Sequence, residues 1–475
     1  MKYLKLLSLF IVISFNVNAQ DKLNLYSDKQ ANDTYAITHV NVIPMTKDNT
    51  VIKNATVVIQ HTKIQSINGA IPKHAKIIDG TGKWLIPGLI DMHVHNLASS
   101  SPFVMYPTKG PLVNYNTQDL MTLYVANGVT TVFELSAKPE HIGQRNEITR
   151  GDVIGPRIAL AALIDGKGMS MTATNPSDGR QAVRIAKAEQ YEFIKVYSQL
   201  NEETFKAIID EAKQQNMKVV GHIPTVFKGK PGKDFFIPHF GLIAHAEELS
   251  KQTNDYSYEK AKEFARLAKE NGTRLIPNLS NMESIIKQAK SLQSIQDLQS
   301  FKYVHPLMQS KWLTANRYNG ASEELIEYFQ HQADFHKLIV KAFKENNVPM
   351  VAGTDAGTSG IVWGFSLHDE LKLLVEAGLT NEEALASGTR LGAKWLEIDD
   401  KVGTIEMGKF ADLILLEDNP LLNISNTRKI SGVFVNGKWL DETKIDSMLL
   451  GVENWNNANK ENYDWNALIN SLNDY

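Results

Sequence analysis

Residues 85–95 read LIPGLIDMHVH, an apolar run that ends in two histidines. Side chains alternate between the two faces of a β-strand, so His93 and His95 would point to the same side. The apolar residues before them predict a buried strand over Trp84–His95. In a (β/α)8 barrel the functional side chains lie at the carboxyl ends of the strands, which is where these two histidines fall.

Seven further apolar runs follow and alternate with helical patterns. Unbroken apolar runs separated by amphipathic helices indicate a parallel sheet covered on both faces, and eight such units predict an α/β fold, a (β/α)8 TIM barrel. The helices are clearest at Ser322–Glu345 and at Thr380–Lys394, which starts with the spacing of a capping box. A doubly wound sheet is the competing fold. The predicted strands are Trp84–His95, Val129–Leu135, Arg157–Ala162, Phe193–Tyr197, Lys218–Ile223, Gly241–Ala246, Thr273–Leu279 and Val348–Asp355.

Both ends of the chain carry short β-type runs. Tyr35–Trp84 holds several, separated by turn residues, and is too short to close a core alone. Ala411–Leu416 and a hairpin around Asn436-Gly437 supply further strands. We therefore expect a small β-sandwich built from both ends. The predicted domains are a signal peptide at 1–19, sandwich at 20–84, barrel at 85–400, sandwich at 401–445 and a tail at 446–475.

The first twenty residues have the pattern of a signal peptide. Lys2 and Lys5 precede the apolar run Leu6–Val17, and Val17-Asn18-Ala19 fits the small-x-small cleavage rule. A membrane anchor is the alternative, but the run is short of the ~20 residues that span a bilayer. We predict cleavage after Ala19 and an exported protein, periplasmic or secreted, without a membrane anchor.

Composition excludes several classes of function. The chain has no cysteine, so disulfides, thiolate metal sites, iron–sulfur clusters and cysteine nucleophiles are excluded. Its net charge is −3, and loss of the two lysines of the signal peptide lowers it further, so no broad basic field exists to bind nucleic acid. We expect a small-molecule substrate, and a homo-oligomer remains open. Any metal must be held by histidines and carboxylates.

Five of the eight predicted strands carry a metal-competent or ionisable side chain near the carboxyl end. A single histidine there is more often a hydrogen-bonded structural residue, but this set together favours a metal site, since imidazole and carboxylate groups bind Zn²⁺ and similar ions. The set is His93, His95, Lys195, His222, His245 and Asp355.

Lys195 is the exception, because an ammonium group would repel a cation. Reaction of its amine with CO₂ would give an anionic carbamate that can bridge two metals. The alternative is a lysine that binds a substrate anion or is solvated.

These motifs resemble the amidohydrolase superfamily, most closely its imidazolonepropionase-like and prolidase-like exported branch. The resemblance runs from Tyr35 to Trp439. It rests on 85–95 (LIPGLIDMHVH), 128–132 (GVTTV), 193–197 (FIKVY), 220–222 (VGH), 243–248 (IAHAEE), 353–357 (GTDAG), 403–409 (GTIEMGK) and 419–421 (NPL).

The resemblance implies a role for each candidate. His93, His95 and Asp355 would bind the more buried metal, and His222 and His245 the second. Carboxylated Lys195 would bridge the two, and Asp355 would take a proton from the metal-bound water and pass it to the leaving group. Imidazolonepropionases proper use one metal and lack the lysine, so its presence here favours two metals, with Zn²⁺ expected.

Other polar residues near the predicted strand ends have two interpretations each. Tyr197 shares the facing of the strand-four lysine and could donate a hydrogen bond to substrate. His368 either packs the start of a helix or contacts substrate. Glu134 is structural or faces the barrel mouth. Glu247 and Glu248 could bind a cationic group, although solvation at the start of a helix is favoured.

The resemblance implies a hydrolase that cleaves the amide C–N bond of a dipeptide-like or cyclic amide substrate. A lactonase or phosphotriesterase on the same site, and a catalytically silent exported binding protein, are the alternatives. The substrate itself stays open. Specificity would lie in loops 96–117, 165–178 and 224–240 and in a helical lid within 280–347. Loop 224–240 carries Lys228, Lys230 and Lys233, which could attract a substrate carboxylate but are better explained as solvated.

Overall fold

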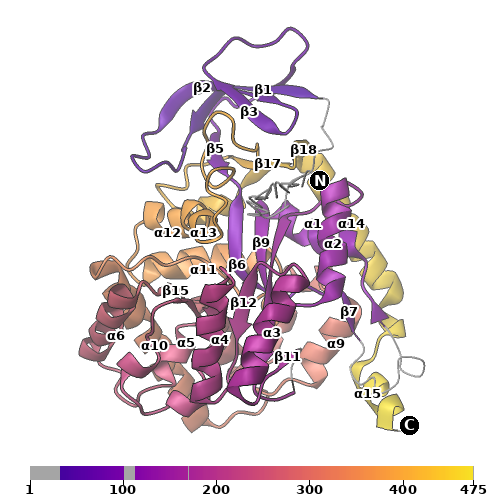
Figure 1. Ribbon diagram of the computed structural model, residues 1–475. Helices are drawn as coiled ribbons and strands as arrows, with labels where there is room; N and C mark the ends of the chain where they lie inside the picture. Colours follow the sequence, from indigo (N-terminus) through magenta and orange to yellow (C-terminus); the bar gives the residue numbers. More distant parts are fainter. Residues whose placement is uncertain (1–32, 101–112, 169–170, 474–475) are drawn as a thin grey trace, which may run out of the picture.

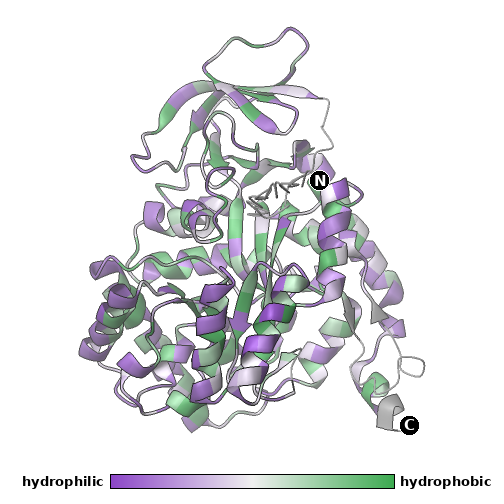
Figure 2. Ribbon diagram, viewed as in Figure 1, coloured by the Kyte–Doolittle hydropathy of each residue, from purple (hydrophilic) through white to green (hydrophobic). Residues whose placement is uncertain are grey.

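A computed structural model describes residues 33–100, 113–168 and 171–473. The predicted signal peptide at 1–19 lies outside the described residues, as does part of loop 96–117. The described chain forms a barrel with a mixed sheet at one end of it (Figure 1). Apolar residues concentrate on the strands, and the outer surfaces of the helices are hydrophilic (Figure 2). Within the described residues, every helix is too short or too polar to cross a bilayer.

The barrel has seven regular parallel strands in the order β15-β14-β13-β12-β10-β9-β6. The predicted barrel is thus confirmed in its architecture. A short strand, β11 (Met171–Thr172), is added beside β10. The barrel strands are β6 (Leu89–Val94), β9 (Val129–Ala137), β10 (Arg157–Asp165), β12 (Phe193–Val196), β13 (Lys218–Gly221), β14 (Phe240–Ala244) and β15 (Arg274–Ile276).

The eighth predicted strand, Val348–Asp355, is an extended segment without a regular ladder. Val351 N donates to Leu275 O of β15 (3.0 Å), and Met92 N of β6 donates to Ala352 O (2.9 Å), so the segment closes the gap between these strands. The ladder is interrupted because Ala352 N instead donates to the carbonyl of Ser387 (3.0 Å) and because Asp355 has a left-handed backbone (φ 65°).

Helices cover the outside of the barrel. The predicted helix Ser322–Glu345 is confirmed as α10 (Glu323–Glu345), with Ser322 as its N-cap. The predicted helix Thr380–Lys394 is instead two helices, because the carbonyl of Gly388 accepts a hydrogen bond from Ile90 N of β6 (2.7 Å) and the helix breaks there. These two are α12 (Asn381–Ser387) and α13 (Arg390–Trp395). The others are α1 (Thr117–Ala126), α2 (Pro139–Arg150), α3 (Pro176–Ala188), α4 (Glu202–Gln214), α5 (Glu247–Ser250), α6 (Tyr258–Asn271) and α11 (Phe365–Glu376).

The segment between β15 and α10 is helical. It contains α7 (Leu279–Lys290), α8 (Gln293–Gln296) and α9 (Pro306–Thr314). Residues 446–475, expected as a tail, hold most of α14 (Glu442–Asn459) and all of α15 (Trp465–Asn473). α14 packs against α1, and α15 against α9.

The small sheet joins strands from both ends of the chain in the order β18-β17-β16-β5-β1-β2-β3, with β4 paired to β1. The predicted strand Trp84–His95 is divided between the two sheets at Gly88. A Cβ at Gly88 would lie 2.1 Å from Thr130 Oγ1, so only glycine fits at this crossing. The strands are β1 (Thr34–Val42), β2 (Ile52–Gln60), β3 (Lys63–Ile67), β4 (Lys76–Asp79), β5 (Trp84–Pro87), β16 (Leu413–Leu416), β17 (Ile430–Val435) and β18 (Lys438–Asp441).

Candidate metal centre

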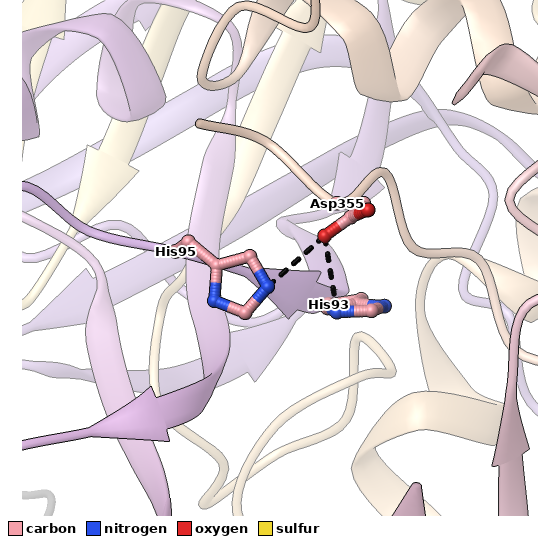
Figure 3. A group of neighbouring side chains, drawn as sticks. All are labelled: His93, His95 and Asp355. Atoms are coloured by element: carbon pink, nitrogen blue, oxygen red, sulfur yellow. Dashed lines mark ion pairs between the residues drawn. The ribbon is translucent and has the colours of Figure 1, made fainter. Parts of the chain in front are cut away.

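The end of β6 and the end of the extended segment 348–355 bring His93, His95 and Asp355 together (Figure 3). Their ligand atoms lie within 4.8 Å of one another. Asp355 Oδ1 is 3.2 Å from His93 Nε2 and 3.0 Å from His95 Nε2. The backbone holds this group, since Asp355 N donates to the carbonyl of His93 (2.8 Å). The His-x-His spacing on β6 therefore directs both imidazoles toward one carboxylate.

His222 and His245 extend this group across the barrel. They directly follow β13 and β14, and their ring centroids are 5.1 Å apart. The ring of His245 is 4.7 Å from that of His93, and its Nε2 is 4.0 Å from Asp355 Oδ2. The four imidazoles thus form a continuous row of ring contacts beside one carboxylate.

Lys195 is fully buried on β12. Its Nζ has no hydrogen-bond partner among the described residues, and it lies 6.0 Å from the centre of the Tyr197 ring. Burial lowers the pKa of its ammonium group to about 8. A buried amine without a partner is costly, so this position points to a partner that binds there.

The protonation states favour metal ligation. Burial, followed by the charge of Lys195, holds the pKa of His93 and His222 well below the usual value, and burial lowers that of His245 to about 4. Burial also disfavours the charged form of His95, but Asp355 and Glu134 outweigh it and raise its pKa to about 9. Three buried imidazoles are therefore neutral near pH 7, as metal ligands must be.

These residues fit a divalent cation. Neutral imidazoles and a carboxylate are the nitrogen and oxygen donors that Zn²⁺ takes. His93 Nε2 and Lys195 Nζ are both buried without a hydrogen bond, although His93 Nε2 is close to Asp355. A bound cation would be a partner for His93 Nε2. Carboxylation would give the side chain of Lys195 oxygens that can bind a cation.

Two asparagines that sequence reasoning missed hold the group from outside. Asn281 Nδ2 donates to Asp355 Oδ2 (2.6 Å), and Asn278 Oδ1 is 3.4 Å from His93 Nδ1. Both lie at the start of α7. The sequence presented Asn278 as part of the predicted strand Thr273–Leu279 and Asn281 as part of a helical lid. No local pattern marks them, because their role depends on where α7 packs.

The acidic residues noted in the sequence lie around the imidazoles. Glu134 is buried at 3.5 Å from His95 Nδ1 and accepts hydrogen bonds from Asn96 N and Ser136 N. Glu248 is buried rather than solvated, accepts from Ile223 N (3.0 Å) and lies 3.3 Å from His222 Nδ1. Burial inside the barrel end, not the helix dipole, therefore sets the environment of Glu248.

An open cavity of about 550 Å³ lies beside this group and is lined in part by His95, His222, His245 and Asp355. Tyr197 lines it too, with its ring 4.1 Å from that of His222. Glu247 is also in the wall. His368 does not line the cavity. It is buried on α11, and its Nδ1 lies 2.9 Å from Thr427 Oγ1, which agrees with a packing role rather than with contact to substrate.

Comparisons with known proteins agree with this geometry. The model of the amidohydrolase family matches residues 84–440. The 5'-deoxyadenosine deaminase of Methanobrevibacter smithii is 27% identical over 239 residues, 46% of this chain and 52% of that enzyme, so the match spans about half of the enzyme. The 5-methylthioadenosine/S-adenosylhomocysteine deaminase of Thermoanaerobacter pseudethanolicus is 20% identical over 455 residues, covering 86% of this chain and 94% of that one.

Solved structures share the fold. A Xaa-Pro dipeptidase with bound methionine superposes with a TM-score of 0.65 at 22% identity, covering 86% of this chain and 100% of that one. Bottromycin amidohydrolase gives a TM-score of 0.66 at 19% identity, with 88% and 90% covered. At these identities the likeness establishes the architecture alone.

Proposed function

This chain belongs to the amidohydrolase family, and from that premise we propose that it is a metal-dependent hydrolase that cleaves the C–N bond of a small amide substrate. The observation that carries the proposal is the group His93, His95 and Asp355, with ligand atoms within 4.8 Å, beside an open cavity. A binding protein needs no such group, which speaks against the catalytically silent alternative.

The proposal has six metal ligands: His93, His95, Lys195, His222, His245 and Asp355. His93, His95 and Asp355 would hold one cation, His222 and His245 a second, and Lys195 would serve both after carboxylation. Zn²⁺ suits these donors. When bound, such a cation lowers the pKa of a bound water molecule to about 7 and polarises a carbonyl group.

Carboxylation of Lys195 requires its amine in the neutral form. The free amine attacks CO₂, a C–N bond forms, and one proton is released as the carbamate ionises. The pKa of about 8 that burial gives this amine supplies more of the neutral form near pH 7 than an exposed lysine would. Nζ has no hydrogen-bond partner among the described residues, so carboxylation would break no hydrogen bond there.

Asp355 is the proposed general base. Its carboxylate accepts a proton from the attacking water and donates it to the leaving nitrogen. Burial raises the pKa of Asp355, but His245 and His95 outweigh burial, and the net shift is downward, so the carboxylate is ionised and ready to accept. Tyr197, in the cavity wall, is placed to donate a hydrogen bond to the substrate.

The substrate class of the proposal is a dipeptide-like or cyclic amide. It rests on the resemblance of the motifs to prolidase-like members of the family, and this chain shares its fold with a Xaa-Pro dipeptidase. Hydrolytic deamination is the second candidate, favoured by two curated relatives that are named deaminases. A screen of dipeptides, N-acyl amino acids, cyclic ureides, lactones and adenosine analogues separates these, because only deamination of the analogues releases ammonia.

Metal analysis combined with an Asp355→Asn variant tests the mechanism. We expect the dialysed wild type to retain divalent metal, and the variant to lose turnover by about 10²- to 10⁴-fold. Asp369→Asn, an exposed aspartate on α11, is the matched control and should leave turnover unchanged. A wild type without metal, or a variant as fast as wild type, would contradict the mechanism.

Export is part of the proposal as well. If the chain is processed after Ala19, the mature protein begins at Gln20. Amino-terminal sequencing of protein from the periplasmic or culture fraction checks this directly, and an intact Met1 in the cytoplasm would contradict it.

A further inference from the structure

The cavity beside the metal ligands has two cationic side chains in its wall that lack a carboxylate partner. Arg317 and Lys311 both line it, and among the described residues neither forms an ion pair. We propose that they form a subsite for a substrate carboxylate, so that the enzyme acts on amides whose far end carries a free carboxyl group. The inference rests on the proposed hydrolase function and adds the substrate class to it.

The other charges of the cavity do not cancel these cations. Its acids are Glu247 and Asp355. Asp355 belongs to the metal ligands. Glu247 is 3.0 Å from Lys251 Nζ, which also pairs with Glu248 at 2.9 Å, so one lysine serves two carboxylates. Against these two acids the wall has three cations, Lys251, Lys311 and Arg317. Arg317 and Lys311 therefore leave a positive excess for an anionic ligand.

The side chain of Arg317 is held in place before any ligand binds. Its guanidinium lies 4.8 Å from the centre of the Tyr318 ring and donates a hydrogen bond to the Tyr318 hydroxyl. This uses one of its five N–H groups, and the others remain for a bidentate pair with a carboxylate. A guanidinium that is already oriented loses less entropy on binding.

The turn that carries Arg317 is tied to the loop that follows Asp355. Asn316 Nδ2 donates to Ser359 Oγ (3.0 Å) and to Gln288 Oε1 (2.8 Å), and Gln288 Nε2 donates to the carbonyl of Ser359 (2.8 Å). The separation between the proposed subsite and the general base is thus fixed by hydrogen bonds. A fixed separation selects substrates by the distance from scissile amide to carboxylate.

The three lysines of loop 224–240 do not serve this purpose. None of Lys228, Lys230 and Lys233 lines the cavity, and Lys230 pairs with Glu202 (2.6 Å). Lys311, in contrast, is partly buried in the wall, with its Nζ 4.7 Å from the centre of the Trp465 ring.

Pairs of substrates that differ only in the carboxyl group test the subsite. Glycyl-leucine, glycyl-phenylalanine and N-acetylmethionine are each compared with their carboxamides. We expect the metal-loaded wild type to prefer the acids. Arg317→Gln should lower kcat/KM for the acids by about 10- to 100-fold, mainly through KM, and change the amides by no more than about twofold. Arg317→Lys should recover part of the loss. Lys233→Gln is the control and should leave kcat/KM for both acids and amides unchanged.

Binding is measured separately from turnover, by calorimetry of the same pairs on the Asp355→Asn variant with and without Arg317→Gln. Tighter binding of acids than amides that disappears with Arg317→Gln supports the subsite, even if no pair is cleaved and the proposed hydrolase function fails. Equal binding of acids and amides, or an acid preference that survives Arg317→Gln in a protein with an unchanged circular dichroism spectrum, overturns it.

Discussion

Asn281 is the residue that holds the second carboxylate oxygen of Asp355, the proposed general base. Its amide donates to Asp355 Oδ2 (2.6 Å), while Oδ1 faces His93 and His95. A carboxylate held at both oxygens keeps one orientation, and misplacing a proton acceptor by a fraction of an ångström slows proton transfer.

We expect Asn281→Ala to lower kcat by about tenfold with little change in metal content, because Asp355 would be free to rotate. Steady-state kinetics and metal analysis check this. Asn346→Ala, which removes a hydrogen bond to the carbonyl of Ala342 at the end of α10, is the control. An unchanged kcat would remove Asn281 from this role, and loss of metal would assign it to holding the ligands instead.

Lys195 gives the second residue-scale prediction. If two cations bind as proposed, Lys195→Ala should lower the metal content from two ions per chain toward one, because the proposed carbamate cannot form. Short carboxylic acids such as acetate and propionate fit the vacated space and should restore part of the content and turnover. Metal content equal to that of wild type would indicate a single-metal site.

The candidate ligands could be predicted from the sequence because they follow a local rule: each stands at the carboxyl end of an apolar run. Asn281 and Arg317 follow no such rule. Asn281 lies 74 positions before Asp355, and its contact with that carboxylate depends on how α7 packs over the barrel. For a polar residue inside a helical pattern, the sequence alone predicts exposure to solvent, and only the packing of the helix shows otherwise.

At the scale of elements, the start of α7 depends on α11. α7 begins at Asn278, whose side chain makes no capping hydrogen bond, and Glu370 of α11 accepts from Ser280 N instead (2.7 Å). α11 therefore caps the helix that brings Asn281 and its N-cap residue Asn278 to the candidate metal ligands. Glu370 itself is fully buried.

The pKa of Glu370 yields a pH-dependent prediction. Burial raises it from 4.5 to about 7, so the folded state keeps a proton that the unfolded state releases between these values. The free energy of unfolding should thus fall as pH rises from 4.5 through 7. Glu370→Gln, which stays neutral, should lose less stability than wild type between about pH 5 and about pH 8, by at most about 3 kcal/mol.

Urea unfolding of wild type and Glu370→Gln, in the presence of a metal chelator at about pH 5 and about pH 8, measures the change in the free energy of unfolding for each protein. Glu376→Gln, an exposed substitution on the same helix, is the control. Parallel pH profiles for wild type and Glu370→Gln would show that Glu370 is ionised in the folded state throughout.

The apolar run over Trp84–His95 shows what sequence patterns miss at this scale. Both halves are buried, so hydropathy alone joins them into one strand, whereas β5 and β6 belong to different sheets. The close approach of Thr130 to Gly88 explains the division, and it involves a neighbouring strand that the pattern does not contain.

At the scale of the whole molecule, the order of strands and helices was enough to predict the barrel and the pairing of both chain ends. The helices α14 and α15 were not predicted, because their packing partners, α1 and α9, are distant in sequence. One buried ion pair, between Arg157 at the start of β10 and Asp412 just before β16, joins the barrel to the small sheet.

This pair should make the two sheets unfold together. Asp412→Asn removes the negative charge of Asp412 from the buried guanidinium of Arg157 and should lower the free energy of unfolding by about 3–5 kcal/mol, in one transition. Glu417→Gln, which breaks the more exposed pair with Lys83 (2.7 Å), should cost less than about 1 kcal/mol. The double variant Arg157→Met with Asp412→Leu should recover much of the loss, because apolar side chains can replace a buried pair.

Urea unfolding followed by tryptophan fluorescence and by metal release measures both parts of the molecule. Two separate transitions in wild type, or equal costs for Asp412→Asn and Glu417→Gln, would show that the sheets are stabilised independently of this contact.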